Sequence, residues 1–209
     1  LNGMSRARKL EGLDQTSEVV RGAIEKPIAV PMNGAVYFAD ILNGQKTGLF
    51  FDQRVNHEFA SKLSKNREIL DVFSHVGGFG LATLVAGAKS ATLVDSSQNA
   101  LELAQKGAEK SGVGDRVTII KSDAFDAMSE LNKSGKKFDF VICDPPAFSP
   151  SKQTLNSGLR AYERVALLSS RLITTNGYLA LCSCSHAVDL QKVRNACLRG
   201  IARTGRQAQ

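Results

Sequence analysis

The chain has 209 residues, of which 43% are hydrophobic and 22% charged, with a net charge of +7. This composition is typical of a soluble globular protein. No apolar run is long enough to span a bilayer. No positively charged start leads into a short apolar stretch, so no signal peptide is visible. The positive charge permits binding to nucleic-acid phosphates without proving it. Four cysteines are too few for a secreted disulfide scaffold, which favours reduced thiols in the cytoplasm.

The first part of the chain predicts a small β-hairpin. Residues 1–26 are polar and weakly patterned, which indicates helix or loop. Two β-favouring runs, AVYFADIL and TGLFF, then flank NGQK, and an Asn-Gly pair is a strong hairpin-turn signal. Pro27 and Pro31 argue against a central strand just before it. We interpret residues 1–55 as an N-terminal segment that contains this hairpin.

From Arg67 onward, apolar runs alternate with amphipathic ones. Alternating strands and helices predict an α/β fold, with a doubly wound, mostly parallel sheet and helices on both faces. The predicted strands are 68–73, 90–95, 116–123, 137–144 and 177–185, and the predicted helices are 79–88, 96–112, 124–135, 158–173 and 187–204.

Residues that follow the strands are candidates for a ligand site, because open α/β sheets bind ligands beyond the carboxyl ends of their strands. A glycine-rich turn follows the first strand, Asp95 the second, Asp123 the third, and DPPAF the fourth. An acid placed like Asp95 is typical of ribose binding, and Asp123 is placed to meet an adenine amine. Alternatively, the glycines form only a tight turn and both acids are helix caps.

These features in this order resemble the class I S-adenosylmethionine-dependent methyltransferases. A closer resemblance, from about Lys26 to His186, is to the family of large-subunit ribosomal RNA cytosine-C5 methyltransferases. It is carried by LNGQKTGLFFDQR, LDVFSHVGGFGLATLVAGA, DPPAFSPSK and GLRAYERVALLSSRLITTNGYLALCSCSH. Members usually have an N-terminal PUA RNA-binding domain and two further strands. The resemblance therefore implies that residues 56–209 are a methyltransferase domain, cut after its fifth strand and helix, within a longer protein.

The resemblance implies S-adenosylmethionine as cofactor and assigns residues to its parts. Gln53 and Arg54 would close over it, and Asp144 would lie near the transferring methyl. The remaining assignments are Phe73, Ser74, Gly77, Gly78 and Phe79 for the methionine part, Asp95 with Ser96 or Asn99 for ribose, and Asp123 and Ala124 for adenine.

The stretch CSCS raises the question of a nucleophile. Carbon 5 of a pyrimidine becomes reactive when a thiolate adds at carbon 6, and the resemblance places this role on Cys184. Strand alternation would put Cys182 on the same face but deeper, as a core residue. The alternatives are that Cys184 is simply a buried thiol, or that Cys182, Cys184, His186 and His75 bind zinc, for which a second ligand pair is missing. No metal is predicted.

The segment around DPPAF is the candidate substrate site. Asp144 is a second candidate catalytic residue, either as the base that removes a proton or as a contact to the cytosine amine. Phe148 is expected to stack on a base that has left its stack, or to anchor the loop. The RNA-contact candidates are Pro145, Phe148, Lys152, Arg160 and Tyr162.

Other functions remain open from sequence alone. DPPAF resembles the loop of methyltransferases that act on base nitrogens, although Ala147 interrupts that pattern. A non-catalytic RNA-binding module and a nicotinamide-dependent oxidoreductase are further alternatives. The expected partner is ribosomal RNA, with no membrane, and the sequence leaves a homodimer open.

Overall fold

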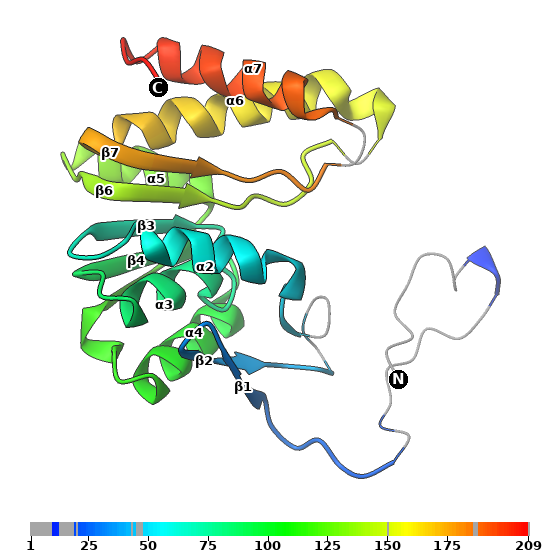
Figure 1. Cartoon of the computed structure of the whole chain (residues 1–209). Helices are drawn as coiled ribbons and strands as arrows, with labels where there is room; N and C mark the ends of the chain where they lie inside the picture. The colour runs from blue at the N-terminus through cyan, green and yellow to red at the C-terminus, as the bar shows by residue number, and fades with distance from the viewer. Residues whose placement is uncertain are drawn as a thin grey trace.

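The computed structural model describes residues 10–12, 19, 21–42, 44, 48–149, 151–185 and 188–208. Its centre is a five-stranded sheet with the order β5-β4-β3-β6-β7, and every neighbouring pair is parallel (Figure 1). The strand order reverses between β3 and β6, so the predicted doubly wound sheet is confirmed. The strands are β3 (Glu68–Val72), β4 (Ser90–Asp95), β5 (Val117–Lys121), β6 (Phe138–Cys143) and β7 (Ile173–Leu181).

Helices cover both faces of the sheet. Ile69 of β3 packs in one core cluster with α2, α3 and α4, whereas the next residue, Leu70, packs in another with α5 and α6. This alternation follows from the two-residue period of a strand. The last helix, α7, packs against α6 through Tyr162 and Ala196 (Figure 1). The helices are α2 (Arg54–Lys62), α3 (Gly78–Val85), α4 (Gln98–Lys110), α5 (Ala124–Lys133), α6 (Leu155–Arg171) and α7 (Leu190–Ala202).

None of the helices within these ranges combines the length and the apolar character that a membrane span requires.

A two-stranded hairpin is present, but its turn lies at an earlier Asn-Gly pair than the one predicted. Strands β1 (Ile28–Met32) and β2 (Ala35–Ala39) pair antiparallel. The turn is Asn33-Gly34, with φ angles of 51° and 79°, as a two-residue hairpin turn requires. Residues 43 and 45–47 of the expected turn region lie outside the described residues, and residues 48–51 are not a strand. A two-stranded ribbon tolerates Pro31 because proline at an edge costs few ladder hydrogen bonds.

The hairpin is fixed to α4. Val36 N donates a hydrogen bond to Ser111 Oγ at 2.8 Å, just beyond the end of that helix. A Cβ atom on Gly107 of α4 would lie 2.7 Å from Val36 O, so the two backbones approach closely. Tyr37 is fully buried in the same cluster as α3 and α4.

Strand β7 starts and ends earlier than predicted. Thr174 lies within it, Cys182 and Cys184 lie beyond its last residue, and the register of its pairing with β6 shifts near Phe138. The prediction that Cys184 ends the fifth strand is therefore wrong. The two cysteines occupy an irregular segment after the strand, where strand alternation does not set their direction.

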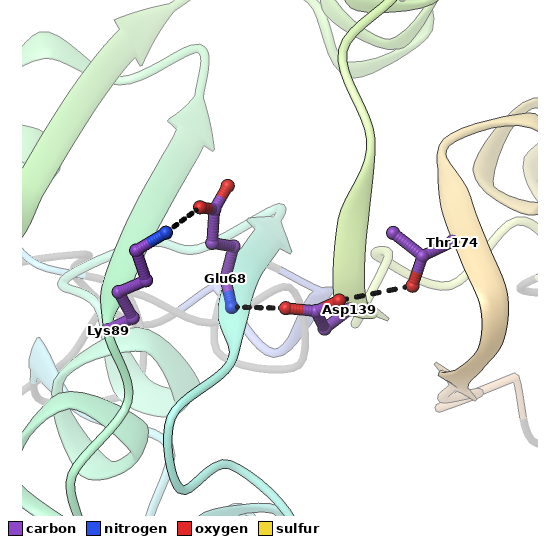
Figure 2. Close-up of polar contacts among 4 residues, drawn as sticks. All are labelled: Glu68, Lys89, Asp139 and Thr174. Atoms are coloured by element: carbon purple, nitrogen blue, oxygen red, sulfur yellow. Dashed lines mark hydrogen bonds and ion pairs between the residues drawn. The ribbon is translucent and has the colours of Figure 1, made fainter.

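The amino ends of the strands are held together by a chain of polar contacts (Figure 2). Asp139 of β6 accepts hydrogen bonds from Glu68 N at 3.0 Å and from Thr174 Oγ1 at 3.1 Å, which joins β3, β6 and β7. The Glu68 side chain in turn pairs with Lys89 at 2.6 Å. These contacts lie at the end of the sheet opposite to the carboxyl ends of the strands, where the candidate site is.

Candidate functional site

The turn after β3 has an unusual backbone conformation. Phe73, His75 and Gly77 have φ angles of 64°, 50° and 81°, and such angles are strained in residues other than glycine. Gly77 N donates to Ser74 O at 2.8 Å, which closes the turn. A Cβ atom on Gly78 would lie 2.8 Å from the His57 ring, so glycine is needed there for close packing. The turn leads directly into α3, whose first N–H groups point toward the carboxyl end of the sheet.

Buried polar atoms without partners gather beside this turn. Ser74 is 5% exposed, and its Oγ has no hydrogen-bond partner among the described residues. The same holds for Nδ1 of His57 and for Oδ1 of Asp71, whose other oxygen accepts from Gly80 N at 2.8 Å. Buried polar groups are nearly always paired, so these atoms mark a place where a ligand can supply the missing bonds.

Asp71 is a site-adjacent residue that the sequence analysis missed. It is fully buried in β3, and burial raises its pKa to about 8, with the negative charges of Asp144 and Asp95 acting in the same direction. The hydrogen bond from Gly80 N partly opposes this shift of the pKa. An acid inside the apolar run EILDVF was the available signal, because such a residue is costly in a core unless it has a role.

Asp95 ties two strand ends together. Its Oδ2 accepts from His75 N at 2.8 Å, and its Oδ1 accepts from Ser97 N at 2.9 Å. It does not cap α4, because Ser97 does so through Ala100 N. Burial lowers the pKa of His75, and the charge of Asp95 opposes this. The carboxylate is thus held rigidly at the carboxyl ends of β3 and β4.

Asp123 is the cap of α5, as one interpretation of the sequence predicted. Its side chain accepts hydrogen bonds from Phe125 N and Asp126 N at 2.8 and 3.2 Å. A carboxylate has about four lone-pair sites, so capping and adenine binding are compatible. Ala124 beside it is buried, whereas Ser96 and Asn99 on the α4 side are exposed.

The segment that leads into α2 lies against the site. Gln53 Nε2 donates to Asp144 Oδ1 at 3.1 Å, which joins this segment to the loop after β6. The Phe50 ring meets the His75 ring edge-on at 5.1 Å. His57 packs on Phe79 at 4.4 Å between ring centroids, and burial lowers the pKa of His57 to about 4. Arg54 is exposed, at the start of α2.

The four cysteines differ in their surroundings. Cys184 is exposed, and its Sγ lies 3.7 Å from Pro145 O, to which the thiol donates a hydrogen bond. Cys182 is half-buried, and burial, followed by the charge of Asp144, raises its pKa to about 12. Cys143 and Cys197 are buried, and burial raises the pKa of both thiols. Cys184 is therefore the most exposed of the four cysteines.

Phe148 and Tyr162 pack against each other, and Tyr162 is the more deeply buried of the two. The half-buried Phe148 ring contacts the rings of Phe73, Phe125 and Tyr162, with centroids 6.3, 6.2 and 5.1 Å away. Tyr162 is 1% exposed, and its hydroxyl contacts Ser183 and Ser185. The prediction that Tyr162 touches RNA directly is wrong for this structure, because no part of the side chain reaches the surface.

The remaining RNA candidates divide into exposed and buried residues. Arg160 is exposed on α6, and Pro145 is buried. Arg164, one turn further along α6, stacks its guanidinium over the Phe125 ring at 4.5 Å. The side chain of Lys152 lies outside the described part of the chain.

The alternative zinc site has no counterpart among the described residues, which contain no group of three or more His, Cys, Asp or Glu side chains able to hold a metal. His186, one of its proposed ligands, lies outside the described residues.

Comparisons with known proteins agree with this geometry. Residues 10–201 match the model of a family described as S-adenosylmethionine-dependent methyltransferase. Ribosomal RNA large subunit methyltransferase I from Aeromonas salmonicida (strain A449) is 35% identical over 204 residues, which are 97% of this chain and 52% of that protein. The chain thus spans about half the length of this relative.

Two solved structures share the fold. One is a candidate SAM-dependent methyltransferase from Streptococcus mutans, with a TM-score of 0.79 and 19% identity, over 90% of this chain and 49% of that chain. The other is a candidate methyltransferase complexed with SAH, with a TM-score of 0.78 and 19% identity, over 88% of this chain and 49% of that chain.

Proposed function

Because the chain belongs to the family of S-adenosylmethionine-dependent methyltransferases, we propose that it methylates carbon 5 of a cytosine in large-subunit ribosomal RNA, with Cys184 as covalent nucleophile. One observation carries the proposal: the exposed Cys184 thiol lies 3.7 Å from Pro145 O, next to Asp144 and at the ligand-binding end of the sheet. The ribosomal substrate is suggested by the name of the relative from Aeromonas salmonicida.

The residues around the turn after β3 fit the cofactor. Ser74 Oγ, buried without a partner among the described residues, can bond to the polar methionine end. Asp95, fixed by two backbone N–H groups, is placed to accept from ribose hydroxyls, and Asp123 and Ala124 flank the expected adenine position. When bound, the cofactor supplies an electrophilic methyl group on a sulfonium.

The contacts of Asp144 suggest how the cleft is closed. Gln53 bonds to Asp144 from the segment before α2, so this segment can cover a ligand at the carboxyl end of β6. The other residues proposed for the methionine and ribose parts follow β3 or β4 along the chain: Phe73, Gly77, Gly78, Phe79, Ser96 and Asn99. Arg54, proposed to close over the cofactor with Gln53, is the first residue of α2.

In the proposed reaction, the Cys184 thiolate donates an electron pair to carbon 6 of cytosine and forms a carbon–sulfur bond. Carbon 5 would then be the nucleophile that takes up the methyl group supplied by the bound cofactor, with a neutral thioether as the leaving group. Asp144 is the proposed base that removes the proton from carbon 5. The electron pair of that C–H bond restores the double bond between carbons 5 and 6, and the thiolate is expelled.

The RNA would approach over the exposed thiol. Arg160 on α6 and Lys152 are the proposed phosphate contacts, and the net charge of +7 favours RNA in general. Phe148 would offer its open edge to the flipped base while its other side packs on Tyr162. An RNA-modifying enzyme of this kind, with free thiols, would work in the cytoplasm.

Trapping with RNA that contains 5-fluorocytosine tests nucleophile and substrate together. Fluorine at carbon 5 cannot be removed as a proton, so the adduct with Cys184 should persist and migrate as a covalent complex. Cys184→Ala should abolish the complex and slow methyl transfer at least about 1,000-fold. The matched control Cys197→Ala removes a buried thiol in α7. It should still form the covalent complex and transfer methyl groups at the wild-type rate. Methyl transfer by Cys184→Ala at the wild-type rate would instead favour an enzyme acting on a base nitrogen through the DPPAF loop.

A further inference from the structure

We propose that Tyr162 is a positioning residue that holds Cys184 in the cleft, an inference that rests on the proposed function. The Tyr162 hydroxyl lies 2.8 Å from Ser183 Oγ and 2.8 Å from Ser185 Oγ. These two serines are the immediate neighbours of Cys184 along the chain. One buried hydroxyl thus contacts the residue on each side of the thiol.

The segment around Cys184 depends on such side-chain contacts. Strand β7 ends at Leu181, and the last ladder-like bond runs from Cys182 N to Cys143 O at 2.9 Å. Beyond it, Ser185 N donates only to the nearby Ser183 Oγ, at 3.4 Å. A chain segment without ladder hydrogen bonds must satisfy its polar groups in other ways. Tyr162 supplies the link from this segment to the rigid helix α6.

The same hydroxyl network reaches the loop after β6. Ser185 Oγ also accepts a hydrogen bond from Ser149 N at 3.3 Å, and Ser149 is fully buried. The Phe148 ring packs against the Tyr162 ring at 5.1 Å. The two loops are therefore joined at Ser149 as well as at Pro145, where the Cys184 thiol donates its hydrogen bond.

This arrangement has a chemical consequence. Addition to carbon 6 requires the sulfur to approach one face of the base closely, and a misplacement of about 1 Å can slow such a step about 100-fold. Because the Tyr162 hydroxyl is buried against Ser183 and Ser185, it would reach neither the reacting base nor the methyl donor. It acts through Ser183 and Ser185 on the position of the Cys184 sulfur.

The Tyr162→Phe variant tests the hydroxyl alone, because it keeps the ring that packs in the core. We expect the kcat of methyl transfer to fall about 100-fold, with a KM for S-adenosylmethionine within about twofold of wild type. The matched control is Ser170→Ala, which removes another buried hydroxyl from α6, one that bonds within the helix to Ala166 O at 2.6 Å. This control should retain the wild-type rate.

A second measurement needs no RNA. Iodoacetamide alkylation of Cys184, followed by mass spectrometry, should become several-fold faster in Tyr162→Phe, because the thiol is released from Pro145 O. The double variant Tyr162→Phe with Ser185→Ala should be no slower in methyl transfer than the slower single variant, as expected for residues that act as one unit. Should Tyr162→Phe fail to fold, Ser183→Ala at an exposed position removes one arm of the contact and should slow transfer about tenfold.

The outcomes separate this inference from the proposed function. If alkylation of Cys184 is unchanged in Tyr162→Phe, or if this variant keeps the wild-type kcat although Cys184→Ala is inactive, Tyr162 does not position the thiol. Losses that add up in the double variant would also overturn the inference. If Cys184→Ala still transfers methyl groups while Tyr162→Phe speeds alkylation, the covalent mechanism fails and the positioning role stands.

Discussion

At the amino end of the sheet, Asp139 joins β3, β6 and β7 through paired hydrogen bonds (Figure 2), whereas at the carboxyl end Ser74 Oγ and Asp71 Oδ1 are buried without partners among the described residues. The carboxyl end also carries non-glycine residues with left-handed φ angles, Phe73 and His75. Unpaired polar groups and strained backbone both cost free energy. The contrast indicates that one end of the sheet stabilises the fold, and that the other keeps bonding capacity for a ligand.

The largest expected effect on stability comes from Asp71→Asn. Burial raises the pKa of Asp71 to about 8, from 3.8 for an ordinary aspartate. Between these values the folded state binds more protons than the unfolded state, so the free energy of unfolding of the wild type falls as the pH rises toward 8. The variant keeps an acceptor for Gly80 N and does not titrate. The free energy of unfolding of the variant should therefore not fall with pH through this residue. At neutral pH it should be higher than that of the wild type by as much as about 4 kcal/mol.

Urea denaturation of both proteins between about pH 4 and about pH 8 measures this slope. Asp115→Asn, at an exposed position, is the control and should keep the wild-type slope. Parallel curves for the wild type and Asp71→Asn would mean that Asp71 is not the source of the pH dependence.

At the opposite end, Asp139→Ala should lower the free energy of unfolding by about 2 kcal/mol, because it leaves Glu68 N and Thr174 Oγ1 without their acceptor. Affinity for S-adenosylmethionine, measured by calorimetry, should stay at the wild-type value. Asp139→Asn keeps one acceptor and should cost less. If Asp139→Ala lost cofactor affinity without losing stability, the amino end of the sheet would serve binding and not stability, contrary to the comparison.

Tyr37→Phe should have a smaller effect on stability and a clear effect on binding. The Tyr37 hydroxyl donates to Gly78 O at 3.1 Å, and burial raises the pKa of this hydroxyl, so it stays protonated as a donor. Its removal should cost about 1 kcal/mol of unfolding free energy and weaken cofactor binding several-fold by loosening the glycine-rich turn. Tyr178→Phe, on the exposed side of β7, is the matched control and should bind the cofactor normally.

The smallest effect is expected for Lys89→Ala. The Lys89–Glu68 pair has a distance of 2.6 Å, but the two side chains are 68% and 34% exposed. Water and salt screen such pairs, so the thermal unfolding midpoint should be indistinguishable from that of the wild type. A drop as large as that of Asp139→Ala would show that the surface pair, and not the shared carboxylate, holds the amino end together.

The fold could be predicted from sequence because its signals are local. Most strands of the sheet are short apolar runs, and α4, α5 and α7 begin at the capping residues Ser97, Asp123 and Asp189. The hairpin turn was predicted at the wrong place because the sequence contains two Asn-Gly pairs, at 33–34 and 43–44. Pro31 argued against a strand next to the first pair, which is the one that forms the turn. The end of β7 was misjudged because apolar character continues through Cys182 after the ladder has stopped.

The candidate site was only partly predictable, because its contacts join distant parts of the chain. Residues after strands, such as Asp95 and Asp144, follow from the topology of a parallel sheet. Tyr162 was assigned to RNA because it matches the pattern of the family that the sequence resembles, and nothing local shows that its hydroxyl meets Ser183 and Ser185. The burial of His57 against the turn after β3 could not be predicted from the sequence either, because it depends on how α2 packs against α3.

The wide sequence separation of these contacts has a consequence for the order of folding. Gln53 and Asp144 are 91 residues apart, Pro145 and Cys184 are 39 apart, and Tyr162 and Ser183 are 21 apart. Joining such distant residues requires closing large loops, and the entropy cost is recovered only after the sheet has assembled. In a nascent or half-assembled chain the Cys184 sulfur is therefore far from Pro145, and both this contact and that between Tyr162 and Ser183 form only once β7 has docked.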